Sequence, residues 1–201
     1  MNRRLAAVLT LVAFGALARI SVADDKKSAE MSAQEKAMME AWAKYATPGE
    51  AHKKMAALEG SWIAKVTQWM APGAPANESA GTSEFKSILG GRYLTQSFSS
   101  TMMGQPFSGF GISGYDNAKK TTQSVWTDTF GTGMLIMSGS WGADGALTES
   151  GSMDDFMTGK PMTIKTRMQI SDNDHMHYEM WMPAPDGKMF KDLDIVYTRV
   201  K

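Results

Sequence analysis

Two histidines stand two residues apart in the segment His175-Met176-His177, and Glu179 continues the same alternate row. Imidazole nitrogens bind zinc, copper or nickel, and histidine is the usual proximal ligand of haem. In a strand, alternate side chains share one face. His175 and His177 are therefore candidates for a metal or haem site, although the opposite row of the same segment is apolar and is expected to face inward, which leaves both imidazoles in solvent.

A second set of polar and aromatic residues lies in segments that look like strands. Arg92 and Gln96 alternate with Leu94 and Phe98, so we expect both to point inward. Three more candidates lie near strand ends, where the mouth of a barrel would be: Tyr115, Trp126 and Asp128. Such groups orient a ligand in an apolar site. The alternative is that an Arg and an Asp pair with each other and hold strands together, since burial without partners is costly.

Catalytic motifs are not found in the sequence. There is no Gly-x-Ser-x-Gly elbow, phosphate-binding loop, His-Glu-x-x-His helix or dinucleotide fingerprint. The paired carboxylates Asp154-Asp155 and Asp172-x-Asp174 lie in expected turns, where local backbone hydrogen bonds are the usual role of aspartate. We assign no catalytic residue and no cofactor, and an enzyme that uses Arg92, Tyr115 and Asp128 remains an alternative.

The elements that would position these residues are short strands. From Ser61 onward, segments of 7 to 11 residues are separated by turn sequences rich in Gly, Pro, Asp and Asn. The predicted strands are 61–70, 79–88, 91–100, 107–115, 121–128, 133–141, 146–152, 161–170, 175–183 and 189–199. Close spacing leaves no room for helical crossovers, so neighbours pair as antiparallel hairpins. We predict a mainly β fold, an antiparallel up-and-down barrel of about ten strands, with a two-sheet sandwich as the alternative.

One or two helices precede the strands. Ser32 and Glu35 have the spacing of a capping box, which predicts a helix over 32–46, and a second, shorter helix ends near Leu58. The first helix carries Met38, Met39 and Trp42. We expect this stripe to be buried, with the helix either plugging the barrel mouth or packing on its wall.

Strand alternation predicts an interior rich in Met and aromatic residues, a soft and adaptable lining. In the strand 175–183, the apolar row is Met176, Tyr178, Met180 and Met182. Such residues either fill a packed core or line a pocket. A barrel of ten strands favours a pocket, because barrels wider than about eight strands tend to enclose a cavity.

The two ends of the strand region carry a recognisable pair. Gly60-Ser61-Trp62 opens the first strand, and Arg199 ends the last one, which an up-and-down barrel places beside the first. Trp62 is expected to close the barrel floor, with Arg199 stacked on its face. This pattern resembles the lipocalin and fatty-acid-binding (calycin) barrels, and it implies a small-ligand carrier.

A second resemblance covers about residues 50 to 199. It is carried by the segments Gly90-Gly91-Arg92-Tyr93-Leu94, Met103-Gly104-Gln105-Pro106-Phe107, Gly114-Tyr115-Asp116-Asn117, Trp126-Thr127-Asp128 and Gly131-Thr132-Gly133-Met134. The chain resembles an uncharacterised bacterial family catalogued as domain of unknown function 1579. That resemblance implies a bacterial, often exported protein and supplies no activity.

Export is also predicted by the N-terminus. Arg3 and Arg4 precede an apolar run that ends in Ser21-Val22-Ala23, the order of a secretory signal peptide, so we expect cleavage after Ala23. The domains are then a signal peptide (1–23), a linker with helices (24–58) and a barrel (59–201). The mature chain would carry 18 basic and 21 acidic residues, and this mild negative charge argues against nucleic acid. No Cys is present, which excludes disulfides and thiolate chemistry.

The sequence thus predicts a periplasmic or secreted barrel that carries a hydrophobic or amphipathic molecule. The predicted ligand-binding residues are Arg92, Gln96, Tyr115, Trp126, Asp128 and Met180. A haem or metal protein that uses His175 and His177 is the main alternative, and a packed barrel without a ligand is another. No membrane span is expected in the mature chain.

Overall fold

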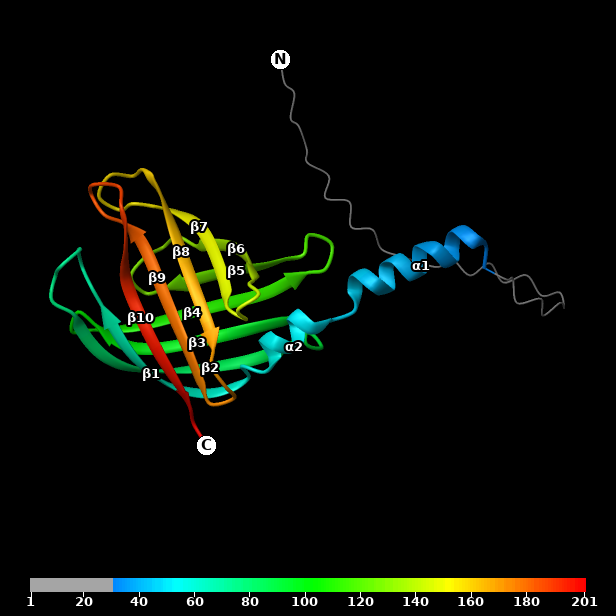
Figure 1. Ribbon diagram of the computed structural model, residues 1–201, viewed down its shortest axis with the longest axis horizontal. Helices are drawn as coiled ribbons and strands as arrows, with labels where there is room; N and C mark the ends of the chain where they lie inside the picture. The colour runs from blue at the N-terminus through cyan, green and yellow to red at the C-terminus, as the bar shows by residue number, and fades with distance from the viewer. Residues whose placement is uncertain (1–30) are drawn as a thin grey trace, which may run out of the picture.

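The computed structural model describes residues 31–201, which form a closed antiparallel barrel of ten strands preceded by two helices (Figure 1). Each strand pairs with the next along the chain, and the first pairs with the last. The strands are β1 (Gly60–Gln68), β2 (Asn77–Ile88), β3 (Tyr93–Met102), β4 (Gln105–Asp116), β5 (Thr121–Asp128), β6 (Leu135–Trp141), β7 (Leu147–Asp154), β8 (Pro161–Ile170), β9 (His175–Pro183) and β10 (Met189–Arg199). The predicted fold class is confirmed, and the sandwich alternative is wrong. The predicted signal peptide lies outside the described residues.

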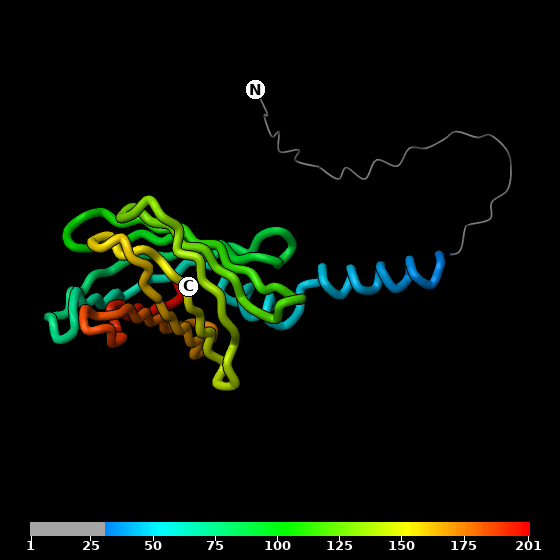
Figure 2. Tube along the Cα trace, turned by 90° about the horizontal axis from the view of Figure 1, so that it is seen from above, coloured from blue at the N-terminus to red at the C-terminus, as the bar shows by residue number. Residues whose placement is uncertain are grey.

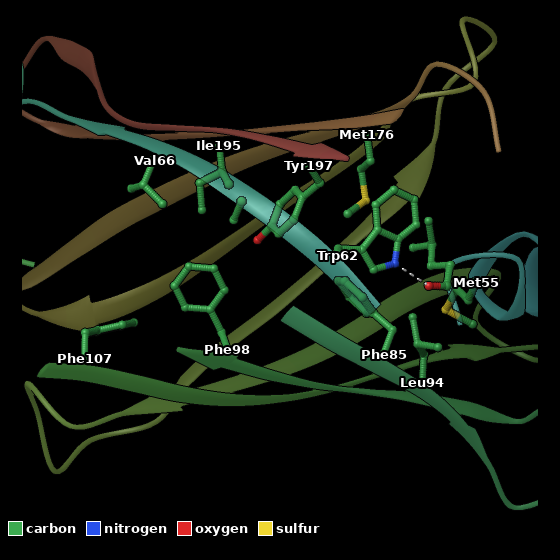
Figure 3. Close-up of a cluster of buried hydrophobic side chains, with 12 residues drawn as sticks. Met55, Trp62, Val66, Phe85, Leu94, Phe98, Phe107, Met176, Ile195 and Tyr197 are labelled. Carbon is green, nitrogen blue, oxygen red and sulfur yellow. Dashed lines mark hydrogen bonds between the residues drawn. The ribbon is translucent and has the colours of Figure 1, made fainter. Parts of the chain in front are cut away.

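Alternation places the apolar rows inside the barrel. In β1, Trp62, Ala64 and Val66 are buried, whereas Ile63 and Lys65 between them are exposed. The main buried cluster gathers side chains from both walls of the barrel and from the helix at one end (Figure 3). Near that end, Met176 of the predicted apolar row is fully buried; Met180 and Met182, further along β9, are only half-buried.

The short helix α2 (Glu50–Ala56) closes this end of the barrel. Its inner face buries Met55 and His52, and each packs into the strand ends. His52 Nδ1 accepts a hydrogen bond of 3.0 Å from the Gly49 amide, and its ring meets Tyr115 edge to face at 5.7 Å. Burial lowers the pKa of His52, which favours the neutral imidazole. The neutral ring can accept the hydrogen bond from the Gly49 amide at Nδ1.

The longer helix α1 (Ala33–Ala46) extends away from the barrel (Figures 1 and 2). It begins at the predicted capping box of Ser32 and Glu35 and buries none of its residues. Met38 and Trp42 are 64% and 62% exposed, so the prediction that this stripe packs on the barrel is wrong. No helix within residues 31–201 is long and apolar enough to cross a membrane.

Hydrogen bonds at the barrel rim explain the direction of α1. Asn117 Nδ2 donates to the carbonyls of Tyr45 and Thr47, both at 2.8 Å. Arg92 Nη2 donates to the carbonyl of Ala46, also at 2.8 Å. These contacts hold the last turn of α1 at the rim, so the rest of the helix points outward.

Candidate functional site

The closed end is built on the first and last strands. Trp62 Nε1 donates to the carbonyl of Leu58 at 2.9 Å (Figure 3), and the Arg199 guanidinium lies 4.1 Å from the centre of the Trp62 ring. That guanidinium also donates to three backbone carbonyls, those of Ala57, Glu59 and Asn173. A Cβ atom at Gly60 would lie 2.8 Å from Arg199 Nη1, and Gly60 has a φ of 128°, so glycine fits this position best.

The inner wall opposite β2 and β3 is polar at mid-height. Glu149 of β7 points inward, and its Oε2 accepts a hydrogen bond of 3.0 Å from Ser124 Oγ of β5. The intervening strand β6 has Gly139 opposite Glu149, so no side chain stands between the two. Burial raises the pKa of Glu149, and hydrogen bonding to the Thr122 and Ser124 hydroxyls opposes part of that rise.

A second buried carboxyl comes from an irregularity in β10. The pairing of β10 with β9 shifts register between Lys191 and Leu193, and Asp192 is the extra residue of this β-bulge. Asp192 is only 5% exposed, and its backbone carbonyl accepts from the Trp69 amide at 2.9 Å. Burial raises the pKa of Asp192 to about 6.

Two tyrosines share the interior with these acids. Burial raises the pKa of Tyr178, and the negative charges of Glu149 and Asp192 add to the rise. Burial also raises the pKa of Tyr197, whose hydroxyl lies 3.3 Å from Gln96 Nε2. Both tyrosines therefore remain protonated hydrogen-bonding groups at neutral pH.

Several buried polar atoms in the barrel lack a protein partner. Within residues 31–201 the buried side-chain atoms without a hydrogen bond are Thr122 Oγ1, Trp141 Nε1, Glu149 Oε1 and Asp192 Oδ1. Thr122 and Glu149 flank Gly139 and interact with each other. Buried polar atoms in native proteins are nearly always paired, so Trp141 Nε1 and Asp192 Oδ1 are the atoms that a bound molecule could satisfy.

The end of the barrel opposite α2 carries two surface hollows. One, of about 630 Å³, lies between the start of β2 and the β3–β4 hairpin and includes Gln68, Asn77 and Met102. The other, of about 350 Å³, lies against Trp69 and Phe190. Neither hollow is lined by Glu149, so both are features of the rim and not of the polar interior.

The family of proteins of unknown function DUF1579 matches residues 47–199, which is most of the chain. The chain belongs to the DUF1579 family. The resemblance predicted from the sequence is thereby confirmed. No curated protein matches the chain.

Two solved structures share the fold of this DUF1579 protein. The crystal structure of Rv2717c from M. tuberculosis is 21% identical with a TM-score of 0.61, covering 77% of this chain and 100% of that one. The S-type phycobiliprotein lyase CPES from Guillardia theta is 9% identical with a TM-score of 0.56, covering 76% and 94%. At these identities the likeness shows the fold alone.

The DUF1579 barrel does not bring together all the predicted site residues. Gln96 points inward and donates to Ser83 Oγ at 3.0 Å, and Met180 lines the interior. Arg92, however, lies in the turn before β3 and is exposed, so the prediction that it points inward is wrong. The turn at Gly90 and Gly91 places Arg92 outside the strand. Its guanidinium instead donates a hydrogen bond to the carbonyl of Ala46 at the end of α1.

Tyr115, Trp126 and Asp128 lie at two different ends. Tyr115 packs against His52 of α2. Asp128 pairs with Gly109, which lies six residues before Tyr115 on β4. At ~3.4 Å per residue, this separation is about 20 Å along the strand. Asp128 accepts hydrogen bonds from Trp126 Nε1 at 3.0 Å and from the Phe130 amide at 2.9 Å. Arg92, Tyr115 and Asp128 therefore form neither one cluster nor an Arg–Asp pair.

The two predicted metal ligands face outward and bond to different carboxylates. His175 Nδ1 lies 2.9 Å from both carboxylate oxygens of Asp172, and His177 Nε2 lies 2.8 Å from Asp194. Potential metal-ligating atoms of three residues, His177, Glu179 and Asp194, lie within 4.8 Å of one another. Lys191 Nζ already bonds to Glu179 at 3.0 Å and to Asp194 at 2.6 Å, so an ammonium group occupies the approach to this group.

The sequence patterns did not indicate three of the buried polar residues, Glu149, Asp192 and Thr166, whereas Tyr178 was predicted to face inward as part of the apolar row of its strand. Glu149 could have been found, because it alternates with the apolar Leu147 in a predicted strand. Asp192 could not be found by alternation, because the bulge shifts the strand face at that residue.

Proposed function

We propose that this barrel binds a small amphipathic molecule in its interior, with the apolar part against the Met and aromatic rows and the polar part at the mid-height acids and hydroxyls. The observation that carries the proposal is the presence of buried polar atoms without a hydrogen bond, Trp141 Nε1 and Asp192 Oδ1, in a barrel whose main buried cluster is apolar. Hydrogen-bonding groups in a mostly apolar enclosure are typical of small-molecule sites.

The lining supports this function. Met168, Tyr178 and Leu193 are inward-facing yet only half-buried, whereas the residues next to α2 are fully buried. The closed end is thus packed, and the apolar surface becomes more accessible toward the open end. A ligand would enter from the end opposite α2.

A pair of substitutions on β8 tests the proposal. Thr166 points inward and is buried, and Thr163 on the same strand points outward and is exposed. We expect the neutral fluorescent probe N-phenyl-1-naphthylamine to bind the wild-type chain. Thr166→Phe should weaken this binding by tenfold or more, because the ring fills the interior, and Thr163→Phe should leave it unchanged.

Ser83→Leu, another inward and buried position, serves if Thr166→Phe does not fold. The proposal is wrong if the probe does not bind the wild-type chain, or if the inward and outward variants bind it equally.

We also propose that the protein is exported and that the mature chain begins at Asp24. The charged, apolar and small-residue segments of residues 1–23 support this. Expression of the full sequence in a Gram-negative bacterium should give a periplasmic chain whose mass matches residues 24–201. A cytoplasmic chain of full mass would contradict export.

A further inference from the structure

We propose that the open end of the barrel docks on the surface of a neutral lipid bilayer through exposed Met and Phe side chains on its hairpins. Docking goes beyond the proposed function, because it concerns the outer surface of the protein and not the interior. A docked barrel would take up its ligand directly from the bilayer, and this use of docking rests on the proposed function.

The hairpin turns of the barrel fall into two sets. Because every strand is antiparallel to the next, successive turns alternate between the two ends. Helix α2 leads into β1, so the turns β2–β3, β4–β5, β6–β7 and β8–β9 lie at the α2 end. The turns β1–β2, β3–β4, β5–β6, β7–β8 and β9–β10 surround the open end, on the left in Figure 1.

Every hairpin at the open end exposes a large apolar side chain at or beside its turn. We call these residues the Met–Phe ring: Met70, Met103, Phe130, Phe156, Met157 and Met189. Within residues 31–201, the turns at the α2 end expose only Leu89 and Tyr93 in the same way, both at the β2–β3 turn. Exposed apolar side chains are thus collected at one end of the barrel, and such a collection marks an interaction surface.

The β7–β8 turn holds its two apolar residues away from the barrel. Phe156 and Met157 are 93% and 81% exposed. Asp155 Oδ1 accepts hydrogen bonds from the amides of Met157 at 2.7 Å and Thr158 at 2.9 Å. The Gly159 amide donates to the Asp155 carbonyl at 2.7 Å. These local bonds define the turn, so both apolar side chains project into solvent, where their exposure is unfavourable unless a partner covers them.

The turns at the open end carry no net charge. Three of them contain no charged residue: 69–76, 103–104 and 129–134. Each of the other two contains one acid and one base, Asp155 with Lys160 and Asp186 with Lys188, and the second pair lies 3.6 Å apart. A nucleic acid or a strongly charged protein surface would meet no opposite charge here, whereas a zwitterionic lipid surface needs none.

The arrangement of the ring favours a flat partner. Its members stand on separate hairpins around the mouth of the barrel, so a planar apolar surface contacts all of them at once. Met and Phe side chains enter the boundary between lipid headgroups and acyl chains without a matching pocket, and Met adapts its shape to its surroundings. The docked barrel has its mouth toward the lipid and α2 away from it.

Flotation with phosphatidylcholine vesicles tests the docking. The protein is residues 24–201, which include all of the described structure and lack the apolar N-terminal run that would itself bind lipid. The wild-type chain should float with the vesicles. The double variant Phe156→Ser/Met157→Ser should weaken partitioning by about tenfold or more, because the two most exposed side chains of the ring no longer enter the lipid.

The matched control removes two exposed apolar side chains from the other end of the molecule. Met38→Ser/Trp42→Ser in α1 should leave partitioning unchanged. Met70→Ser, on a different hairpin of the ring, should also weaken partitioning and serves if the first double variant does not fold. Raising the NaCl concentration from about 0.1 M to about 1 M should not release the wild-type chain, because the contact is apolar.

Three results would overturn the docking inference. The first is a wild-type chain that does not float, and the second is equal weakening by the two double variants. The third is flotation only with vesicles that contain phosphatidylglycerol, which would show an electrostatic contact. If sedimentation equilibrium without vesicles shows a dimer that Phe156→Ser/Met157→Ser dissociates, and the chain does not float, the ring covers a second copy instead.

Binding of N-phenyl-1-naphthylamine without vesicles reports the proposed function separately. The ring variants should bind this probe as the wild-type chain does, because the substitutions lie outside the interior. Probe binding without flotation would overturn the docking and leave the proposed function standing. Flotation without probe binding would support the docking and contradict the proposed function.

Discussion

Asp192 is a buried carboxyl without a compensating cation, and this costs stability. Its pKa is about 6 in the folded chain, whereas an unfolded aspartate titrates near ~3.9. A raised pKa means that the ionised form is disfavoured in the folded state, so the cost is present above pH 6 and disappears as the pH falls toward 4. Residues of this kind are common at binding sites, where function takes precedence over stability.

We therefore expect Asp192→Asn to raise the free energy of unfolding by about 1–3 kcal/mol at pH 8. Near pH 4 most of the gain should be lost, because the aspartate is then protonated in the folded state and about half protonated in the unfolded state. Urea denaturation of both proteins at the two pH values measures the difference, and Asp186→Asn in an exposed turn is the control. An equal gain at both pH values would show that ionisation is not its cause.

The Arg199 side chain holds the closed end of the barrel together. Its planar guanidinium donates to three carbonyls while it stacks on Trp62, and a lysine ammonium cannot reproduce that geometry. Arg199→Lys should lower the free energy of unfolding by about 2 kcal/mol or more. The same change at the exposed Arg92, which bonds to two carbonyls, should cost less than about 1 kcal/mol. If urea denaturation shows that Arg199→Lys and Arg92→Lys lower the free energy of unfolding equally, this role of Arg199 is refuted.

The sequence predicted some site residues and not others for physical reasons. Strand alternation is sufficient for Gln96 and Met180, because they lie within regular strands. It fails for Arg92, which the turn at Gly90 and Gly91 removes from the strand. Aspartate at position 128 was interpreted as a ligand contact, but local hydrogen bonds to Trp126 and Phe130 occupy both carboxylate oxygens.

Among the elements, β6 lies against β7 with no room for a side chain at Gly139. A Cβ atom at Gly139 would overlap the Thr148 carbonyl oxygen, and Glu149 reaches Ser124 past this glycine. Gly139→Ala should lower the free energy of unfolding by about 1–3 kcal/mol, because the strands must separate. Gly133→Ala, where nothing lies within 4 Å, should be close to neutral. A neutral result for both in thermal unfolding would contradict the close packing.

Helix α2 packs against the barrel and helix α1 does not, and only the positions of the two helices could be predicted from the sequence. The capping box of Ser32 and Glu35 marks the start of the first helix, because caps are local interactions. What each helix packs against depends on the rim contacts of Asn117 and Arg92, which are remote in sequence.

Deletion of residues 24–46 should therefore leave the barrel intact. Helix α1 buries no residue, so the melting temperature should change by less than about 4 °C, which corresponds to at most about 1 kcal/mol. By contrast, Met55→Ala in α2 should cost about 2–5 kcal/mol, since Met55 is 3% exposed in the core. A large loss on removing α1 would show that it packs on the barrel in solution.

At the scale of the whole molecule, turn chemistry at regular spacing and the pairing of Trp62 with Arg199 made the closed barrel predictable. The contents of the barrel were harder to predict. The buried polar residues depend on a bulge in β10, which holds Asp192, and on the pairing that puts Gly139 between β5 and Glu149 of β7. Neither feature follows from a local sequence pattern.

The central claim is that this barrel holds a small molecule in its interior. Native mass spectrometry of the protein, purified without unfolding from bacteria that express the full sequence, tests it most directly. We predict one bound small molecule per chain, retained by Thr163→Phe and lost by Thr166→Phe. If the wild-type protein and both variants all show only the mass of the bare chain, the claim is contradicted and a packed barrel is favoured.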